Sequence, residues 1–258
     1  MAENHVRKKL AEGKLAVGLT MRIAPSIEMT AVARQAGFDW LFLDMEHGAM
    51  AVHHVGQLSI AAGMAGITPI ARVTHQDLAT AARLLDSGAH GIIFPHVDTA
   101  DEAQAAAEAC RFAPVGKRSF GGMPPSLGFA PMAATEITRR SNELIFIVAM
   151  IETEKAVANA DAIAAVPGID CLLIGSNDLS LDMGIHGDFG HAKVAAAYEA
   201  VIGACKKHGK VPGMGGIYDT VFAKKYVQMG ARFILGGSDL ALITAGAKAR
   251  TEFFSSLL

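Results

Sequence analysis

The stretch Leu144-Ile-Phe-Ile-Val-Ala-Met-Ile151 is an unbroken run of eight apolar residues, and it ends at the charged residue Glu152. A run without polar alternation is typical of a strand that is buried on both faces of a parallel sheet. Helix-forming residues follow from Glu154 to Ala165. The same order, an apolar run, a polar end and then a helical stretch, recurs along the chain. The sequence therefore predicts an α/β fold.

Eight apolar runs of this kind are expected to be strands, at Leu15–Thr20, Trp40–Met45, Thr68–Val73, Gly91–Val97, Leu144–Ile151, Ile169–Gly175, Val211–Gly216 and Phe233–Gly237. Eight Ala-rich stretches are expected to be helices, at Ser26–Ala36, Val52–Ala65, Asp77–Ser87, Asp101–Arg111, Glu154–Ala165, Lys193–His208, Thr220–Met229 and Asp239–Phe254. Several of these helical stretches end at a glycine, where a helix C-cap is expected.

Eight alternating strands and helices in 258 residues indicate one (β/α)8 TIM barrel over residues 1–258. A doubly wound sheet is the alternative, but the turn after the first strand, Gly18-Leu-Thr-Met-Arg22, lacks the GxGxxG pattern. One long interruption, residues 112–142, is rich in glycine and proline. A connection of that length is usually functional or mobile, so we expect a loop there.

The composition restricts the partners of the chain. Charged residues make up 19% of it, below the roughly 25% of a typical domain, which favours a surface buried against other subunits. The formal net charge of −2 gives no basic field for nucleic acid, and the apolar runs are too short to span a membrane.

Three separated cysteines without a CxxC pair favour neither a disulfide framework nor a zinc ribbon. We expect a reducing, cytoplasmic location, because the polar N-terminus also lacks the apolar core of a signal peptide.

Two acidic residues, Glu152 and Asp178, follow neighbouring predicted strands without a Lys or Arg beside them. The active site of a TIM barrel lies at the carboxyl ends of its strands, so both carboxylates are expected at one mouth. Two such groups repel unless they share a proton or a cation, and oxygen ligands suit Mg²⁺ or Mn²⁺. The alternative is that each carboxylate caps the helix that follows its strand.

Basic and imidazole groups end two further strands. Arg72 lies in an otherwise apolar strand, where it can bind a substrate carboxylate or enolate oxygen or form an internal ion pair with Asp44. Asp44 and His47 are three residues apart, and a carboxylate can fix an imidazole tautomer, which favours His47 as a general base. By strand alternation Glu46 should point away, and no role follows for it.

Gly175, Ser176 and Asn177 offer free backbone N–H groups that can bind a carboxylate or phosphate. No lysine lies at a predicted strand end, so no Schiff-base nucleophile is evident. The histidines outside the strand ends, His53, His54, His75, His90 and His208, are interpreted as surface or packing residues.

The segments from Ala36 to Gly48, with Asp44, Glu46 and His47, resemble the signature of the HpcH/HpaI aldolase family. So do Pro69–Val73, Leu84–Ala89, Ile151–Thr153 and Ile174–Ser180, in order over nearly the whole chain. The resemblance implies a TIM barrel of the phosphoenolpyruvate/pyruvate superfamily type, a hexamer, and a class II enzyme that uses a divalent ion and no organic cofactor.

The resemblance also implies roles for single residues. Glu152 and Asp178 would bind Mg²⁺, Mn²⁺ or Co²⁺, and Arg72 would steady the pyruvate oxygen. His47 with Asp44 would transfer the proton. The N–H groups of Gly175, Ser176 and Asn177 would bind the pyruvate carboxylate, and Asp86 would lie near the site of a neighbouring subunit.

The expected reaction is the reversible cleavage of a 4-hydroxy-2-keto acid to an aldehyde and pyruvate, or a similar keto acid such as hydroxypyruvate. Two departures from the family pattern affect the substrate rather than the metal chemistry: Met150 stands where many members have Gln, and Ser176-Asn177 precedes the acidic residue Asp178. The alternatives are a metal-dependent decarboxylase of oxaloacetate or another 2-keto acid, another lyase that uses the same enolate, and a non-catalytic barrel that binds a ligand.

Overall fold

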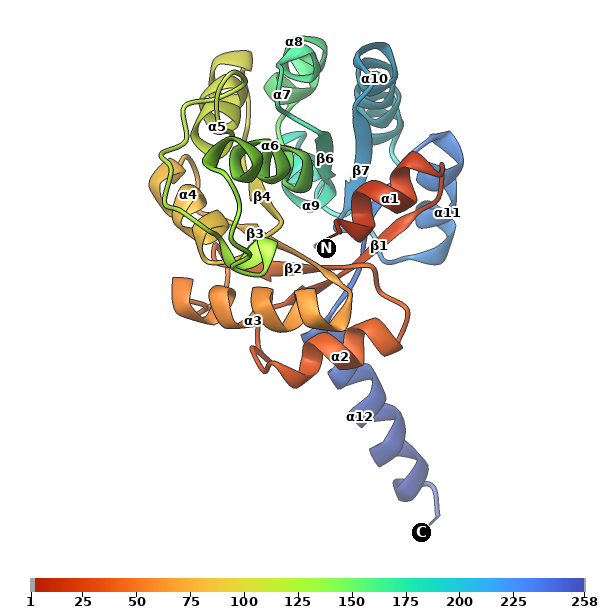
Figure 1. Ribbon diagram of the computed structural model, residues 1–258. Coiled ribbons are helices and arrows are strands. Elements are labelled where there is room, and N and C mark those ends of the chain that lie inside the picture. The colour runs from red at the N-terminus through yellow and green to blue at the C-terminus, as the bar shows by residue number, and fades with distance from the viewer. Residues whose placement is uncertain (1–2, 258) are drawn as a thin grey trace.

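A computed structural model describes residues 3–257 and confirms the predicted barrel, with eight parallel strands that close in sequence order (Figure 1). The strands are β1 Ala16–Met21, β2 Trp40–Asp44, β3 Thr68–Arg72, β4 Gly91–Phe94, β5 Phe146–Ile151, β6 Cys171–Gly175, β7 Val211–Gly215 and β8 Phe233–Ser238. The strands begin and end within one residue of the expected apolar runs, except that β4 ends three residues earlier and β5 and β6 each begin two residues later. The agreement follows because burial on both faces of a strand selects apolar side chains throughout.

The helices pack around the barrel, and most of them fall where they are predicted. They are α1 His5–Ala11, α2 Glu28–Gln35, α3 Val52–Ala65, α4 Leu78–Asp86, α5 Ala100–Cys110, the 3₁₀ helix η1 Pro125–Leu127, α6 Ala134–Leu144, α7 Glu154–Ala158, α8 Ala160–Ala165, α9 Ser176–Asp182, α10 Ala192–His208, α11 Thr220–Met229 and α12 Asp239–Ser255. In the described part of the chain no helix is both long and apolar enough to cross a membrane.

The expectation of a loop over residues 112–142 is wrong for its last third, where α6 begins at Ala134. The face of α6 that carries Ile137, Ser141 and Leu144 is buried, which fixes the helix although the glycines and prolines before it point to irregular structure. The predicted helix Glu154–Ala165 is divided at Asn159 into α7 and α8.

The interior of the barrel is filled by large side chains from alternate strand positions. Trp40 stacks on Phe233, with ring centroids 4.0 Å apart, and Phe146 lies against the other side of Phe233 at 5.4 Å. Val6 of α1 belongs to the same buried cluster, so α1 closes the N-terminal end of the barrel. The mouth at the carboxyl ends of the strands remains the place where polar groups can gather.

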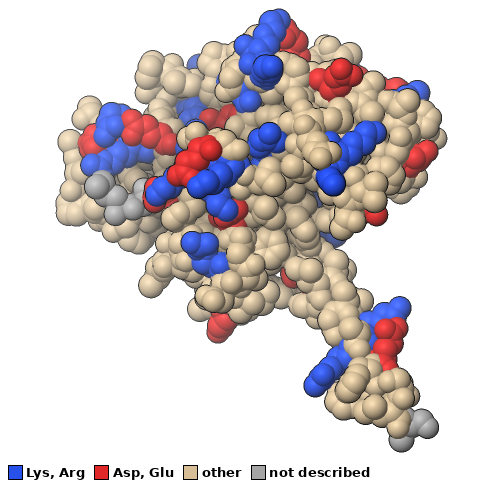
Figure 2. All heavy atoms as spheres, turned by 90° about the vertical axis from the view of Figure 1, so that its right-hand side faces the viewer, with Lys and Arg blue, Asp and Glu red and all other residues tan. Residues whose placement is uncertain are grey.

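Helix α12 extends away from the barrel and ends far from it (Figures 1 and 2). Leu240, Leu242, Ile243, Phe253 and Phe254 on this helix are each about half exposed. Burial of one such side chain contributes about 1.5–3 kcal/mol, so this apolar surface is costly to leave in water. The helix is therefore suited to packing against another surface.

Gly18 of β1 gives Trp40 its place in the barrel, since a Cβ at Gly18 would overlap the indole ring. We expect Gly18→Ala to lower the free energy of unfolding by about 1–3 kcal/mol through overpacking. The matched change Gly63→Ala lies on the exposed side of α3, where a Cβ meets no atom within 4 Å. It should raise stability by about 0.5–1 kcal/mol, because alanine favours a helix over glycine. Urea unfolding at one fixed protein concentration measures both, and equal shifts in the two variants would contradict this account of Gly18.

Candidate active site

The carboxyl ends of β2 and β3 place two of the predicted residues side by side. Asp44 is the last residue of β2 and Arg72 the last of β3, and their Cα atoms are partners in the strand register. Arg72 Nε donates to Asp44 Oδ1 at 2.9 Å and Nη2 donates to Oδ2 at 2.8 Å. The internal ion pair that the sequence left as the alternative for Arg72 is therefore present.

This pair is buried, and its electrostatics are set by that burial. Burial acts to raise the pKa of Asp44, but the hydrogen bonds and charge of Arg72 outweigh it and hold the pKa below its usual value. The guanidinium carbon of Arg72 lies 4.9 Å from the centroid of the Phe42 ring. Nη1 and Nη2 each carry a second N–H, so Arg72 retains donors for a ligand oxygen.

The expectation that Glu46 points away is wrong. Glu46 Oε2 lies 3.0 Å from Arg72 Nη1, on the other side of the guanidinium from Asp44. The strand β2 ends at Asp44, so strand alternation does not extend to Glu46. Instead, Asp44 Oδ1 accepts the backbone N–H groups of Glu46 and His47, at 3.1 and 3.3 Å, which turns the chain toward Arg72.

The structure does not show the expected contact between the Asp44 carboxylate and the imidazole of His47. Both Asp44 oxygens bond to Arg72, and Asp44 holds the backbone of His47 rather than its ring. The carboxylate within 4 Å of the ring is that of Glu46, whose Oε2 lies 3.9 Å from Nε2. The His47 side chain is 54% exposed, so its imidazole is accessible at the mouth.

Glu152 follows β5 and is almost fully buried, with 2% of the residue exposed. Its Oε2 accepts the backbone N–H of His96 at 2.8 Å, and Nδ1 of the same histidine lies 3.5 Å away. Burial raises the pKa of Glu152 to about 7, and the charge of Asp178 acts in the same direction, against the N–H and charge of His96. A nearby cation would therefore favour the charged form of Glu152.

Asp178 lies in the first turn of α9, directly after β6, and is partly exposed. Between the two acids, Gly175 has a structural role, since a Cβ there would lie 2.5 Å from Glu152 Oε1. Ser176 is fully buried and its hydroxyl is 2.8 Å from that of Tyr198. The hydroxyl of Ser176 is thus bonded inside the protein, whereas the side chain of Asn177 is exposed.

The two acids fit a divalent ion that keeps most of its shell for water and substrate. In residues 3–257 no cluster of three or more His, Cys, Asp or Glu side chains is arranged to enclose a metal. Two carboxylates are the common protein contribution to a Mg²⁺ site that leaves positions open. The raised pKa of Glu152 supports the same assignment, because a cation between Glu152 and Asp178 would relieve their repulsion.

Met150 and Asp86 lie outside the group of polar side chains at the mouth. Met150 belongs to the buried interior of the barrel, two residues before Glu152 on the same strand. Asp86 ends α4, and its Oδ1 accepts a hydrogen bond at 2.6 Å from Arg118. Helix α4 runs away from the mouth after β3, so Asp86 is not brought to the site of its own chain.

Sequence reasoning assigned no role to three groups at the mouth. His96 has a positive φ of 50°, which aims its N–H at Glu152, and nothing in the sequence marks such a backbone donor. Arg22 Nη2 donates to the carbonyl oxygen of His47 at 2.8 Å. Tyr218 follows β7 and is about half exposed; partial burial of its phenol raises the pKa, while the charges of Arg22 and Arg72 oppose that shift. The one signal for Arg22 is its position directly after the first strand.

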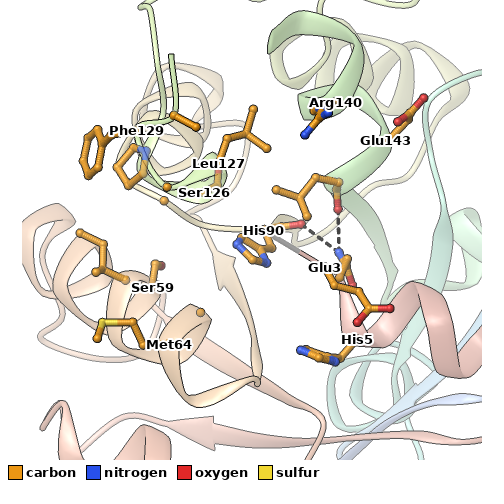
Figure 3. Close-up of a pocket in the computed structure, with 18 of the residues that line it drawn as sticks. Glu3, His5, Ser59, Met64, His90, Ser126, Leu127, Phe129, Arg140 and Glu143 are labelled. Atoms are coloured by element: carbon orange, nitrogen blue, oxygen red, sulfur yellow. Dashed lines mark hydrogen bonds between the residues drawn. The ribbon is translucent and has the colours of Figure 1, made fainter. Parts of the chain in front are cut away.

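A large cavity of about 1080 Å³ lies at the opposite end of the barrel (Figure 3). Its wall includes His90 and Leu144, which directly precede β4 and β5. Figure 3 shows His90 between Ser59 and Met64 of α3 and Arg140 and Glu143 of α6. The strand-end carboxylates are at the other end, so the mouth and not this cavity is the candidate active site.

Comparisons with known proteins show the family of the chain. The family model described as HpcH/HpaI aldolase/citrate lyase matches residues 24–245. A 4-hydroxy-4-methyl-2-oxoglutarate aldolase of Hapsidospora irregularis is 39% identical, over 95% of this chain and 92% of that protein. A hydroxypyruvate/pyruvate aldolase of Pseudomonas aeruginosa is 34% identical, over 93% and 88%.

Among solved structures, an HpcH/HpaI aldolase from Desulfitobacterium hafniense DCB-2 superposes with a TM-score of 0.89 at 34% identity, covering 96% of this chain and 95% of that one. The family match spans most of the chain and includes every strand-end residue of the mouth from Asp44 to Asp178. The protein therefore belongs to the HpcH/HpaI aldolase/citrate lyase family.

Proposed function

We propose that the protein is a class II aldolase that reversibly cleaves a 4-hydroxy-2-keto acid to pyruvate, or a similar 2-keto acid, and a carbonyl compound. The aldolase names of its relatives support this reaction. The observation that carries the proposal is the buried Glu152 carboxylate beside Asp178, which calls for a cation at the mouth. The site lies where catalytic groups of TIM barrels are found.

Glu152 and Asp178 would hold the ion, which we propose to be Mg²⁺, Mn²⁺ or Co²⁺. When bound, such an ion draws electron density from the keto oxygen and favours the enolate that C–C cleavage leaves behind. The backbone N–H of His96 keeps Glu152 oriented at the mouth. No organic cofactor is needed for this chemistry.

The keto acid half of the substrate would lie between β3 and β6. The second N–H groups of Arg72 would donate to the enolate oxygen, and Asp44 and Glu46 keep the guanidinium in place for that task. The backbone N–H groups of Gly175, Ser176 and Asn177, at the start of α9, would bind the carboxylate.

His47 would take the proton of the 4-hydroxyl group. As the C3–C4 bond breaks, its electrons form the enolate, and the C4 oxygen becomes a carbonyl after its proton passes to the imidazole. Glu46, 3.9 Å from Nε2, would stabilise the imidazolium that results. Asp44 contributes by fixing the His47 backbone and Arg72 rather than by contacting the ring.

The proposed enzyme is a homo-oligomer, a hexamer of the kind the family resemblance implies. The half-exposed apolar side chains of α12 support association with further copies. Asp86, with its side chain 49% exposed, would then lie near the site of a neighbouring subunit. Three free, buried cysteines, Cys110, Cys171 and Cys205, are consistent with a reducing compartment, and we propose a cytoplasmic location.

The metal proposal is tested by chelation and by substitution of one carboxylate. EDTA should abolish pyruvate release and added Mg²⁺ or Mn²⁺ should restore it. Glu152→Gln should weaken Mn²⁺ binding by at least 10-fold in calorimetry, because removal of an outer contact alone typically costs 10- to 100-fold. Glu199→Gln, on the exposed side of α10, is the control and should bind as the wild type does. Full activity in excess chelator would refute the metal proposal.

Substitutions of His47 and of Arg72 should have different effects on the rates of two reactions that share one enolate. Oxaloacetate decarboxylation needs the enolate but lacks the 4-hydroxyl proton. His47→Ala should therefore slow aldol cleavage by about 10²–10⁴-fold and decarboxylation far less. Arg72→Ala and Asp44→Asn should slow both, since Asp44 positions Arg72. Metal content is measured in every variant, and equal losses in both reactions for metal-loaded His47→Ala would rule out this role for His47.

The oligomer is tested by light scattering on the full chain. A hexamer of 27.0 kDa subunits would have a mass of 6 × 27.0 = 162 kDa. Leu242→Asp on α12 should shift the protein to smaller species, because a charge on a buried interface is costly to desolvate. Thr251→Asp on the same helix is the control for charge. A monomer of 27.0 kDa at micromolar concentration would overturn the proposal.

A further inference from the structure

The cavity of about 1080 Å³ at the N-terminal end of the barrel is not used by the proposed aldol reaction (Figure 3). It lies between α3 and α6, and its wall is completed by the start of α1, by His90 before β4 and by residues 125–132. Its volume is near the upper limit of the range for small-molecule sites. The cavity is therefore large enough to hold a ligand of its own.

Two buried polar atoms in this wall lack a hydrogen-bond partner. Within residues 3–257, four buried side-chain nitrogen or oxygen atoms are left without one, and Ser59 Oγ and His90 Nδ1 are two of the four. Ser59 is 1% exposed and His90 is 4% exposed, and both line the cavity. Proteins satisfy the large majority of such atoms, because an unpaired buried polar group is costly. Two of them in one cavity wall indicate a ligand that bonds to them.

Both side chains are held at the cavity by the fold. The backbone N–H of His90 donates to the carbonyl oxygen of Pro69 at 2.8 Å, and the His90 carbonyl oxygen accepts the N–H of Phe146 at 2.9 Å. Ser59 lies inside α3, and a Cβ at Gly88 would lie 3.6 Å from Ser59 Cβ. The segment before β4 thus packs directly against α3, which brings the hydroxyl and the imidazole to one wall.

These two groups offer hydrogen bonds without charge. Burial lowers the pKa of His90 to about 4, and the charge of His5 acts in the same direction. At neutral pH the imidazole of His90 is therefore uncharged, with one N–H donor and one acceptor nitrogen. The hydroxyl of Ser59 can likewise donate or accept. An uncharged group that both donates and accepts, such as an amide or a hydroxyl, matches this pair.

The charged side chains of the wall already have partners. Each of its four Lys and Arg residues has a carboxylate within 4 Å, in the pairs Arg7–Asp170, Lys8–Glu3, Arg139–Glu136, Arg139–Glu143 and Arg140–Glu136. Asp170 is shared with Arg111 as well. The two acidic residues of the wall, Glu3 and Glu143, belong to these pairs. A charged ligand would find its counter-ions engaged, whereas an uncharged ligand needs none.

Much of the remaining wall is apolar. Ile60 and Met64 on α3 are 45% and 86% exposed, and Phe129 is 59% exposed. Phe129 has a positive φ of 54°, which is uncommon for an aromatic residue. Burial of such side chains against a ligand is favourable in proportion to the apolar area removed from water. The wall thus suits the ring of a ligand whose polar group lies at Ser59 and His90.

We propose that this cavity binds an uncharged, flat molecule that has an apolar ring and one amide or hydroxyl group. The amide or hydroxyl bonds to Ser59 Oγ and His90 Nδ1, and the ring lies against the apolar part of the wall. Benzamide is a simple molecule of this class and serves as the probe. The proposal does not depend on the aldol reaction, because the cavity and the mouth lie at opposite ends of the barrel.

The first test measures binding of benzamide to the full chain by calorimetry at neutral pH. The expected Kd is about 1 mM or tighter, which is reasonable for a ligand of nine non-hydrogen atoms. Benzoate has nearly the same shape but carries a charge, and it should bind at least about 10-fold more weakly, because a carboxylate without a free counter-ion is costly to remove from water. Saturating pyruvate and Mg²⁺ should leave the affinity for benzamide unchanged.

The second test uses variants of the two unpartnered groups. Ser59→Ala should lower the affinity for benzamide by about 3- to 10-fold, the loss of one neutral hydrogen bond, and His90→Phe should do the same while keeping a flat ring. Ser141→Ala is the matched control, because Ser141 Oγ is also buried and unpartnered but lies outside the cavity wall. Ser141→Ala should bind benzamide as the wild type does. The rate of pyruvate release should be unchanged in all three variants.

Thermal unfolding without ligand separates this role from a structural one. Because the Ser59 hydroxyl has no partner in the free protein, Ser59→Ala should have a Tm within about 1 °C of the wild type or higher. A Tm several degrees lower would show that the hydroxyl is bonded in the free protein, and would contradict the inference.

Four binding results would also overturn the inference: no binding of benzamide to the wild type, equal affinity in Ser59→Ala, equal affinity for benzoate, or competition by pyruvate. None of them bears on the aldolase proposal, which is tested at the mouth.

Discussion

The buried ion pair between Arg72 and Asp44 determines how charge is distributed over the mouth of the barrel. The two residues end neighbouring strands in register, so their side chains meet without a change in either backbone. Removing both from water is costly, and the two hydrogen bonds between them offset that cost only while both partners stay charged. The lowered pKa of Asp44 reflects this.

Because Arg72 is committed to Asp44 and Glu46, it does little to neutralise the acids on the other side of the mouth. Glu152 remains buried beside Asp178, and its pKa rises to about 7. The mouth therefore has two halves: on β2 and β3 the carboxylates are paired with Arg72, whereas on β5 and β6 Glu152 and Asp178 lie beside each other. A divalent ion suits the acidic half, while oriented N–H donors suit the other, and an enolate bridging the halves would be stabilised from both.

The sequence predicts the strands well, since a strand covered on both faces must be apolar throughout, as in the run from Leu144 to Ile151. It predicts less well what depends on the exact path after a strand ends. Glu46 turns toward Arg72 because Asp44 captures two backbone N–H groups, and His96 reaches Glu152 through a positive φ. Side-chain pattern alone contains neither feature. The sequence also does not predict helix α6, because the glycines and prolines before it indicate a loop, although Ile137 and Leu144 form an apolar face that is buried.

Deuterium exchange at the methyl group of pyruvate tests the central claim most directly, because it reports enolate formation without any aldehyde. Followed by NMR in D₂O, the exchange should occur with the Mg²⁺-loaded protein, stop when EDTA is added, and be at least about 10-fold slower in Glu152→Gln at the same Mg²⁺ concentration. Exchange at the wild-type rate in excess EDTA would contradict the account, since the enolate would then form without the ion that Glu152 and Asp178 are proposed to hold.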